Sequence, residues 1–118
     1  MNKKLIAVDL DGTLLNSESK LSHYTIETIQ KVSEQGHRVI ITTGRPYRMA
    51  AHIYKELGLE SPMINFNGAL THIPNKKWSK ELSMTLDKKY LLDMVEREND
   101  IQADFIAGEY RNKFYVTH

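Results

Sequence analysis

The sequence predicts an α/β fold with a doubly wound parallel sheet. Short apolar runs rich in β-branched residues alternate with segments of helical periodicity, and the connections between them are short. Each apolar run is followed at once by polar or glycine residues. Folds of this kind bind ligands at the carboxyl ends of their parallel strands, so those polar residues mark the expected site.

The first strand and helix are expected near the N-terminus. Residues 5–8 form a continuous apolar run that ends at Asp9, which is typical of a parallel strand buried on both faces. Ser22 is the expected N-cap of the following helix, and Gly36 suits its left-handed C-terminal cap. The apolar residues of this helix recur at helical spacing: Ile26, Ile29 and Val32.

The second strand and helix repeat this arrangement. Residues 39–41 are a β-branched run, and Pro46 is expected in the first turn of the next helix. That helix should end before Gly58, with one apolar face made by Met49, Ile53 and Leu57. Residues 63–66 predict a third strand.

The pattern changes after the third strand, and a length of 118 residues suits a small domain plus part of a second. Residues 70–78 suggest a hairpin. A helix and two strands are expected next, at residues 90–97, 103–107 and 113–117. We therefore divide the chain into the N-terminal part of an α/β core, residues 1–82, and a second module that is cut short, residues 83–118. A partial sheet leaves an unpaired edge, so we expect the isolated chain to be marginally stable or to self-associate through that edge.

Composition narrows the function classes. Hydrophobic residues make up 41% of the chain and charged residues 26%, which is typical of a globular protein. The formal net charge is only +1, so neither nucleic acid nor a membrane is an expected partner. The absence of cysteine excludes thiol chemistry and fits a reducing compartment, so a cytoplasmic location is expected. The five histidines show no metal-ligand spacing.

Two carboxylates follow the first strand, in the string Asp9-Leu10-Asp11-Gly12-Thr13. Because they stand two residues apart on extended backbone, both can reach one point, where one attacks a phosphate ester and the other moves protons. Gly12 permits a tight turn beside the phosphate. A hard cation is needed because carboxylate and phosphate repel each other, and all-oxygen ligation favours Mg²⁺.

This string has two other interpretations. Asp11-Gly12 can be a plain turn after a strand. A calcium-binding loop is excluded, because its glycine and glutamate positions would fall on Leu14 and Lys20.

Two further strand ends carry polar residues. Thr42-Thr43-Gly44-Arg45-Pro46 ends the second strand and opens a helix, so a hydroxyl, backbone amides and the positive helix end can meet an anion there. An ordinary N-cap is the alternative. Arg45 can clamp a phosphate or pair with a surface carboxylate, and Asn67-Gly68 can contact a ligand or form a turn.

Together with Asn67-Gly68-Ala69, these strings resemble the haloacid dehalogenase superfamily and, more narrowly, its Cof-like phosphatase branch. The resemblance implies Asp9 as nucleophile and magnesium ligand, and Asp11 as general acid/base with its main-chain carbonyl on the metal. It implies Thr43 as a hydrogen-bond donor to the phosphate, with Arg45 and Asn67 facing the substrate. The other motif residues expected at the phosphate are Leu10, Gly12, Thr13 and Gly44.

Spacing indicates where a lid over this site belongs. About thirty residues separate Thr13 from Thr43, and one crossover helix uses nearly all of them, so no lid fits between them. The segment after Ser83 resembles the start of the α/β cap domain that the Cof-like branch places after its third core strand. The family also requires a later lysine and an acidic pair, and neither can be placed in this chain.

We therefore expect a magnesium-dependent phosphatase that acts on small phosphorylated metabolites such as sugar phosphates, present here as an N-terminal fragment with little activity of its own. Two alternatives stay open. One is a phosphomutase, because related mutases share the first motif. The other is a non-catalytic binding or assembly module that keeps the fold without the chemistry.

Overall fold

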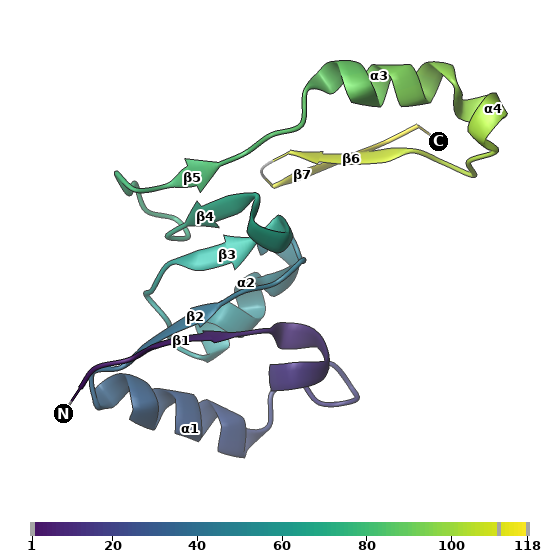
Figure 1. Ribbon diagram of the computed structural model, residues 1–118. Coiled ribbons are helices and arrows are strands. Elements are labelled where there is room, and N and C mark those ends of the chain that lie inside the picture. Colours follow the sequence, from purple (N-terminus) through teal and green to yellow (C-terminus); the bar gives the residue numbers. More distant parts are fainter. Residues whose placement is uncertain (1, 111, 118) are drawn as a thin grey trace. The chain divides into compact units, whose positions relative to one another are not determined.

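The computed structural model describes residues 2–110 and 112–117, and the chain divides into two compact units, Met1–Ser83 and Met84–His118. The first unit contains strands, two helices and two short helical turns, and Figure 1 shows their arrangement. In chain order they are β1 (Leu5–Val8), η1 (Leu10–Leu14), α1 (His23–Glu34), β2 (Arg38–Ile41), α2 (Tyr47–Glu56), β3 (Met63–Asn65), η2 (Phe66–Gly68), β4 (Leu70–His72) and β5 (Leu82–Ser83). The second unit has α3 (Lys88–Glu96), α4 (Glu98–Ile101), β6 (Ala107–Tyr110) and β7 (Lys113–Val116).

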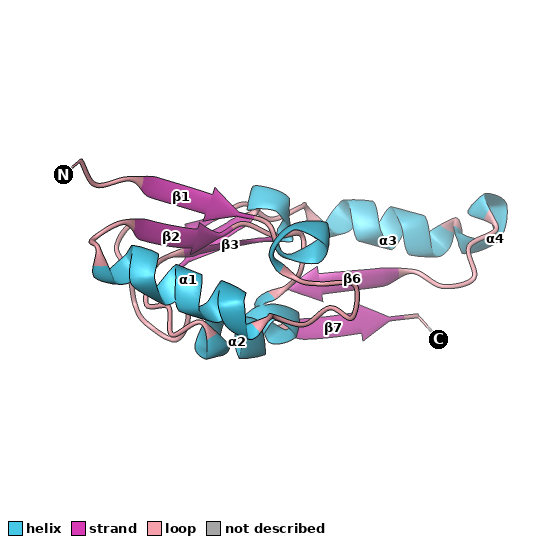
Figure 2. Cartoon of the chain, turned by 90° about the horizontal axis from the view of Figure 1, so that it is seen from below, coloured by secondary structure: helices cyan, strands magenta, loops and turns pink. Residues whose placement is uncertain are grey.

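The strands of the first unit combine parallel and antiparallel pairing. β1 and β2 run parallel, with Val8 opposite Ile41, and point in the same direction in Figure 2. A parallel bridge between Thr42 and Ile64 joins the end of β2 to β3, while β3, β4 and β5 pair antiparallel. The predicted α/β fold with a parallel sheet is confirmed. The carboxyl ends of β1, β2 and β3 therefore lie at one edge of the unit.

Local signals fixed the first helix as expected. The Ser22 hydroxyl accepts a hydrogen bond from the Thr25 amide at 3.1 Å, as an N-cap does. Gly36 has a φ of +92°, which is the left-handed conformation expected after the helix. The start and end of α1 thus follow from residues within the helix's own ends.

The second helix differs from the prediction in two details. Pro46 is extended and stands before the helix as its N-cap, so the helix begins at Tyr47. Met49 is 46% exposed, because the buried stripe is Ala50, Ile53, Tyr54 and Leu57. Those four residues have the i, i+3, i+4, i+7 spacing of one helix face. Residues that repeat every four positions, as the predicted set Met49, Ile53 and Leu57 does, shift gradually around the helix, so Met49 falls off the buried face.

Two strand predictions also need correction. β3 ends at Asn65, because Phe66 takes a positive φ of 53° and starts a turn. The segment 103–107 is not a strand: α4 occupies Glu98–Ile101, Gln102 adopts the left-handed conformation, and β6 begins only at Ala107. The apolar character of residues 103–107 comes instead from side chains such as Ile106, which is buried.

The hydrophobic core of the described residues belongs to the first unit. It is formed by Leu10, Leu15, Ile29, Val39, Ile41, Ala50, Ile53, Tyr54, Leu57 and Met63. These side chains come from η1 and the residue after it, from both helices and the end of α2, and from β2 and β3, and Val8 of β1 packs against them. They therefore fix the strand ends at which polar residues were predicted to meet. Within residues 2–110 and 112–117, no helix combines the length and apolar character needed to cross a bilayer.

Candidate active site

Residues from three strand ends line one hollow. This hollow has a volume of about 380 Å³, and its lining includes Asp9, Thr43, Gly44 and Asn67, together with Ala7, Val8 and Thr42. The structure therefore brings together a carboxylate after β1, a hydroxyl and a glycine after β2, and an amide after β3. Leu10, Asp11, Gly12, Thr13 and Arg45 are not among its lining residues.

The loop after β1 is a tight turn around the first carboxylate. Asp9 is extended, with φ −82° and ψ 160°, and its Oδ1 accepts a hydrogen bond from the Leu10 amide at 2.8 Å. Leu10 is fully buried in the core and does not line the hollow, so its side chain anchors this loop to the core. Gly12 has a φ of +76°, and a Cβ at this position would meet nothing within 4 Å, so the backbone conformation rather than crowding requires glycine there.

Asp11 forms a bidentate ion pair with Arg45. The Arg45 Nε donates to Asp11 Oδ2 at 2.8 Å and Nη2 donates to Oδ1 at 2.5 Å, while Nη1 donates to the Met49 carbonyl at 3.1 Å. This hydrogen bonding lowers the pKa of Asp11 below its ordinary value, and it raises the pKa of Arg45. Of the two roles open to Arg45 from sequence, the structure shows the carboxylate pair, and the partner is the second aspartate of the motif.

Thr43 is buried and held on three sides. Its amide donates to the Ile64 carbonyl at 2.9 Å, and its own carbonyl accepts from the Asn67 amide at 3.2 Å. Its hydroxyl oxygen accepts from the Arg45 amide at 3.1 Å. A hydroxyl that accepts one hydrogen bond keeps its own proton for donation, so Thr43 can donate to an anion in the hollow. The N-cap of α2 is Pro46, so Thr43 is not an ordinary N-cap.

Gly44 and Asn67 fit against each other. Asn67 adopts the left-handed conformation, with φ 55° and ψ 33°, and Gly68 follows with a φ of 105°, so the predicted turn is present. A Cβ on Gly44 would lie 2.9 Å from Asn67 Oδ1 and 3.3 Å from its Nδ2. Asn67 is thus both a turn residue and a lining residue, and its side chain needs glycine at position 44.

Sequence reasoning missed two polar residues behind this loop. Asn65 is fully buried, its Nδ2 donates to the Arg45 carbonyl at 2.9 Å, and its Oδ1 lies 2.6 Å from His72 Nε2. A signal was present, because Asn65 shares an inward face of β3 with Met63 and so places an amide where an apolar side chain is expected. The position of His72 depends on the pairing of β3 with β4 and has no local signal.

The described residues supply part of a metal site. No group of three His, Cys, Asp or Glu side chains is arranged to hold a cation within residues 2–110 and 112–117. The Asp9 carboxylate and the Asp11 carbonyl are oxygen donors of the kind that Mg²⁺ prefers, so they fit two ligand positions and not a complete set. His118, one of the five histidines expected to take no part, lies outside the described residues.

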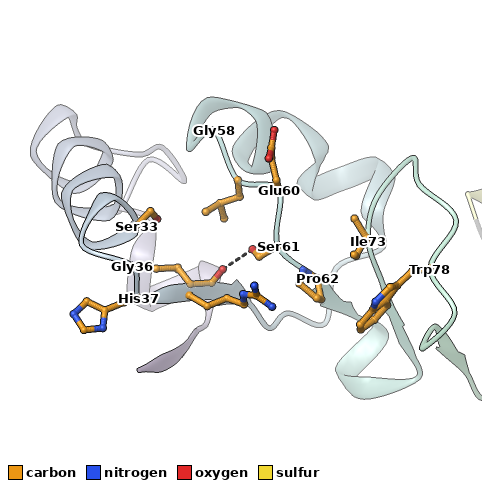
Figure 3. Close-up of a pocket in the computed structure, with 12 residues that line it drawn as sticks. Ser33, Gly36, His37, Gly58, Glu60, Ser61, Pro62, Ile73 and Trp78 are labelled. Carbon is orange, nitrogen blue, oxygen red and sulfur yellow. Dashed lines mark hydrogen bonds between the residues drawn. The ribbon is translucent and has the colours of Figure 1, made fainter. Parts of the chain in front are cut away.

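A second hollow lies at the opposite ends of the strands. It measures about 540 Å³ and is lined by residues that begin β2 or precede β3, among them Arg38, Glu60 and Ser61. Figure 3 shows Ser61 in this hollow, where its hydroxyl donates to the Val39 carbonyl at 2.5 Å. None of the motif residues lines it, so it is not the predicted site.

The profile of the haloacid dehalogenase-like hydrolases matches residues 6–118. The chain belongs to this family. The predicted resemblance, including its narrowing to the Cof-like phosphatases, is confirmed. The polar residues at the ends of β1, β2 and β3 belong to the three strings on which the resemblance to this family was based.

Related phosphatases match this haloacid dehalogenase-like chain over most of its length. It is 45% identical over 111 residues to the 5-amino-6-(5-phospho-D-ribitylamino)uracil phosphatase YitU of Bacillus subtilis, covering 90% of this chain and 41% of that protein. It is 30% identical over 112 residues to a glucosyl-3-phosphoglycerate/mannosyl-3-phosphoglycerate phosphatase of Persephonella marina, covering 95% and 41%. A solved phosphatase of this superfamily from Bacteroides thetaiotaomicron superposes with a TM-score of 0.76 at 26% identity, covering 100% of this chain and 42% of that one. The chain therefore spans about two-fifths of the length of each of these three relatives.

Proposed function

We propose that this chain is part of a magnesium-dependent phosphatase that hydrolyses small phosphorylated metabolites, sugar phosphates included, through an aspartyl-phosphate. The observation that supports the proposal best is the shared hollow of Asp9, Thr43 and Asn67. It combines a nucleophilic carboxylate with hydroxyl and amide donors on rigid strand ends, within a family of hydrolases.

Asp9 and Asp11 divide the chemistry. The Asp9 carboxylate attacks phosphorus, forming an acyl-phosphate while the bond to the substrate's alkoxide oxygen breaks. Asp11 protonates the departing alkoxide and later takes a proton from the water that hydrolyses the acyl-phosphate. The bidentate pair with Arg45 favours ionised Asp11, the form needed for the second step. The first step needs protonated Asp11, so it requires the guanidinium to leave that carboxylate.

Thr43, Gly44 and Asn67 bind the phosphate in this proposal. The Thr43 hydroxyl and the Asn67 amide donate to phosphate oxygens, and the loop residues Gly12 and Thr13 offer backbone amides. When bound, Mg²⁺ neutralises charge between carboxylate and phosphate, with the Asp9 carboxylate and the Asp11 carbonyl among its ligands. Arg45, once released from Asp11, is proposed to face the same anion.

Residues 83–118 are proposed to begin an α/β cap domain. The names of two relatives support the proposed substrate class, because they are phosphatases of a phosphorylated ribityl compound and of phosphorylated glycosyl glycerates. Both substrates are small, polar phosphate esters. We also propose a cytoplasmic location, and the absence of cysteine is the observation that supports it.

The test uses the complete product of the gene. Purified protein is assayed for release of phosphate from p-nitrophenyl phosphate with and without Mg²⁺, and we expect Asp9→Asn to lower kcat at least about 10³-fold. Asp104→Asn makes the same change at an exposed position of the second unit and should leave kcat unchanged. Unchanged turnover in Asp9→Asn would exclude the aspartyl-phosphate route.

Product analysis separates the two alternatives. Conversion of a sugar phosphate to its isomer in the presence of a bisphosphorylated activator, with no release of phosphate, would identify a mutase. Absence of any Mg²⁺-dependent turnover over a panel of sugar phosphates would favour a non-catalytic module.

The 118-residue chain alone is expected to hydrolyse little, because positive charge and metal ligands beyond Asp9 and Asp11 supply much of the transition-state stabilisation in phosphoryl transfer.

A further inference from the structure

A buried hydrogen-bonded chain runs behind the phosphate-binding loop, from His72 on β4 through Asn65 on β3 to the Arg45 carbonyl. We propose that Asn65 and His72 are positioning residues, which orient the Thr43 hydroxyl by fixing the backbone of Arg45. The proposal deepens the proposed function, because the loop that they hold is the one assigned to the phosphate.

The hydrogen bonds of Asn65 have one consistent arrangement. The Arg45 carbonyl can only accept, so the Asn65 side-chain nitrogen must face it, at 2.9 Å. The Asn65 oxygen then faces His72 Nε2, at 2.6 Å, so that nitrogen must carry a proton. Burial also lowers the pKa of His72, which is consistent with a neutral ring protonated at Nε2.

The ring of His72 is itself held by the start of α2. Tyr47, the first residue of that helix, packs edge-on against His72 with 5.8 Å between ring centroids and an angle of 88°. The Tyr47 hydroxyl accepts from Asn75 Nδ2 at 3.1 Å, in the connection after β4. The strand pair and the helix start therefore brace the loop from two sides.

The Arg45 peptide groups connect this chain to the active-site face. The Arg45 carbonyl accepts a hydrogen bond from the Asn65 side chain, and the Arg45 backbone amide donates to the Thr43 hydroxyl oxygen at 3.1 Å. A shift of the Arg45 backbone therefore reorients the Thr43 hydroxyl that faces the phosphate. The other loop bonds, from Thr43 to Ile64 and from Asn67 to Thr43, are backbone bonds that do not specify these side chains.

The activity test uses the complete gene product and three variants. Asn65→Asp keeps the shape but replaces the donor to the Arg45 carbonyl with a second acceptor, and His72→Phe keeps a ring but removes the donor to Asn65. Both should lower kcat/KM for p-nitrophenyl phosphate about 10- to 100-fold, as a displacement of an ångström can do. His72→Gln retains an N–H donor and should recover most of the loss. His52→Phe, on an exposed face of α2, is the matched control and should keep wild-type kcat/KM.

A measurement independent of catalysis accompanies the assay. Hydrogen exchange of the Arg45 amide should accelerate in Asn65→Asp and His72→Phe and slow again in His72→Gln, and ¹⁵N NMR should find the His72 proton on Nε2. Variants with a lower Tm but unchanged kcat/KM and Arg45 exchange would overturn the positioning role. If the wild-type protein does not hydrolyse phosphate esters, the proposed function fails, and the exchange rates and the tautomer alone then confirm or overturn the hydrogen-bonded chain.

Discussion

The two units of the chain use apolar residues in different ways. The first unit buries ten hydrophobic side chains in one cluster, whereas Ile106 is the one buried hydrophobic residue described in the second. α3 and the β6–β7 pair instead expose large side chains, with Leu92 at 56% and Tyr115 at 55%. Amphipathic sequence is therefore enough to define a helix and a hairpin, but it does not by itself provide the second layer that buries them.

The candidate site lies in the well-packed unit. All nine motif residues proposed for the site lie in the first unit, where strand ends are fixed by buried neighbours such as Leu10 and Ile41. An active site needs positions held to a fraction of an ångström, and a packed core supplies that rigidity. The second unit suits a different task, because an apolar surface of this kind is normally covered by further chain or by a partner.

The largest expected effect tests the contrast in packing. Ile53 is 2% exposed on α2, and Ile53→Ala should lower the free energy of unfolding by about 2–5 kcal/mol through lost burial and a residual cavity. Leu92→Ala on α3 should change it by no more than about 0.5 kcal/mol, because that side chain is already largely in solvent. Urea denaturation followed by far-ultraviolet circular dichroism measures both. Equal losses at the two positions would show that the second unit has a core as well.

The next effect concerns the fit between Gly44 and Asn67. Gly44→Ala places a methyl group 2.9 Å from Asn67 Oδ1 and should displace that side chain from the hollow, raising KM for a phosphate ester about tenfold. Gly58→Ala is the control: its φ of +67° makes alanine strained, about 1 kcal/mol, but the added Cβ would meet nothing within 4 Å, and no motif residue lines the hollow to which Gly58 belongs. Steady-state kinetics on the complete gene product should show the wild-type KM for Gly58→Ala. A wild-type KM in Gly44→Ala as well would contradict a role of Asn67 in binding the phosphate.

Much of the first unit could be predicted because its signals are local. An apolar run, an N-cap serine and a left-handed glycine each act within a few residues, so the bounds of β1 and the start of α1 were predicted correctly. The expected burial of β1 on both faces was wrong: none of its four residues is buried and Leu5 is 67% exposed. The meeting of Asp9, Thr43 and Asn67 at one hollow followed from parallel pairing, since strand ends then share an edge. The location of this hollow was therefore available from sequence before any side chain was placed.

What sequence could not give depends on contacts between distant residues. The partner of Arg45 is a choice between several anions, and the structure decides it by bringing Asp11 within hydrogen-bond distance across 34 residues. The Asn65–His72 contact needs the antiparallel return of β4 onto β3. The strand predicted at residues 103–107 was wrong for a related reason. These residues look strand-like on their own, but they form the connection between α4, which ends at the left-handed Gln102, and β6, which begins at Ala107.

A smaller effect sharpens the contrast in surface. We propose that the isolated 118-residue chain self-associates, through its unpaired sheet edge and its exposed apolar residues, so sedimentation velocity should show an average mass that rises with concentration. The double variant Leu92→Lys with Tyr115→Lys should lower that mass, whereas the same number of lysines at exposed polar positions, such as Glu18 and Gln102, should not. A monomeric mass at all concentrations would count against the proposal.

The smallest effect is a pH dependence of the first unit's stability. Burial holds the pKa of folded His72 below its ordinary 6.5, and the nearby charge of Glu81 only partly opposes this. Between the two pKa values the unfolded chain binds more protons than the folded one, so the unfolding free energy falls as pH drops below about 6.5 and is level above it. The slope from one group cannot exceed about 1.4 kcal/mol per pH unit. Urea titrations from pH 5 to 8 should therefore show a shallower slope in His72→Gln, and His52→Gln, at an exposed position, should retain the wild-type slope.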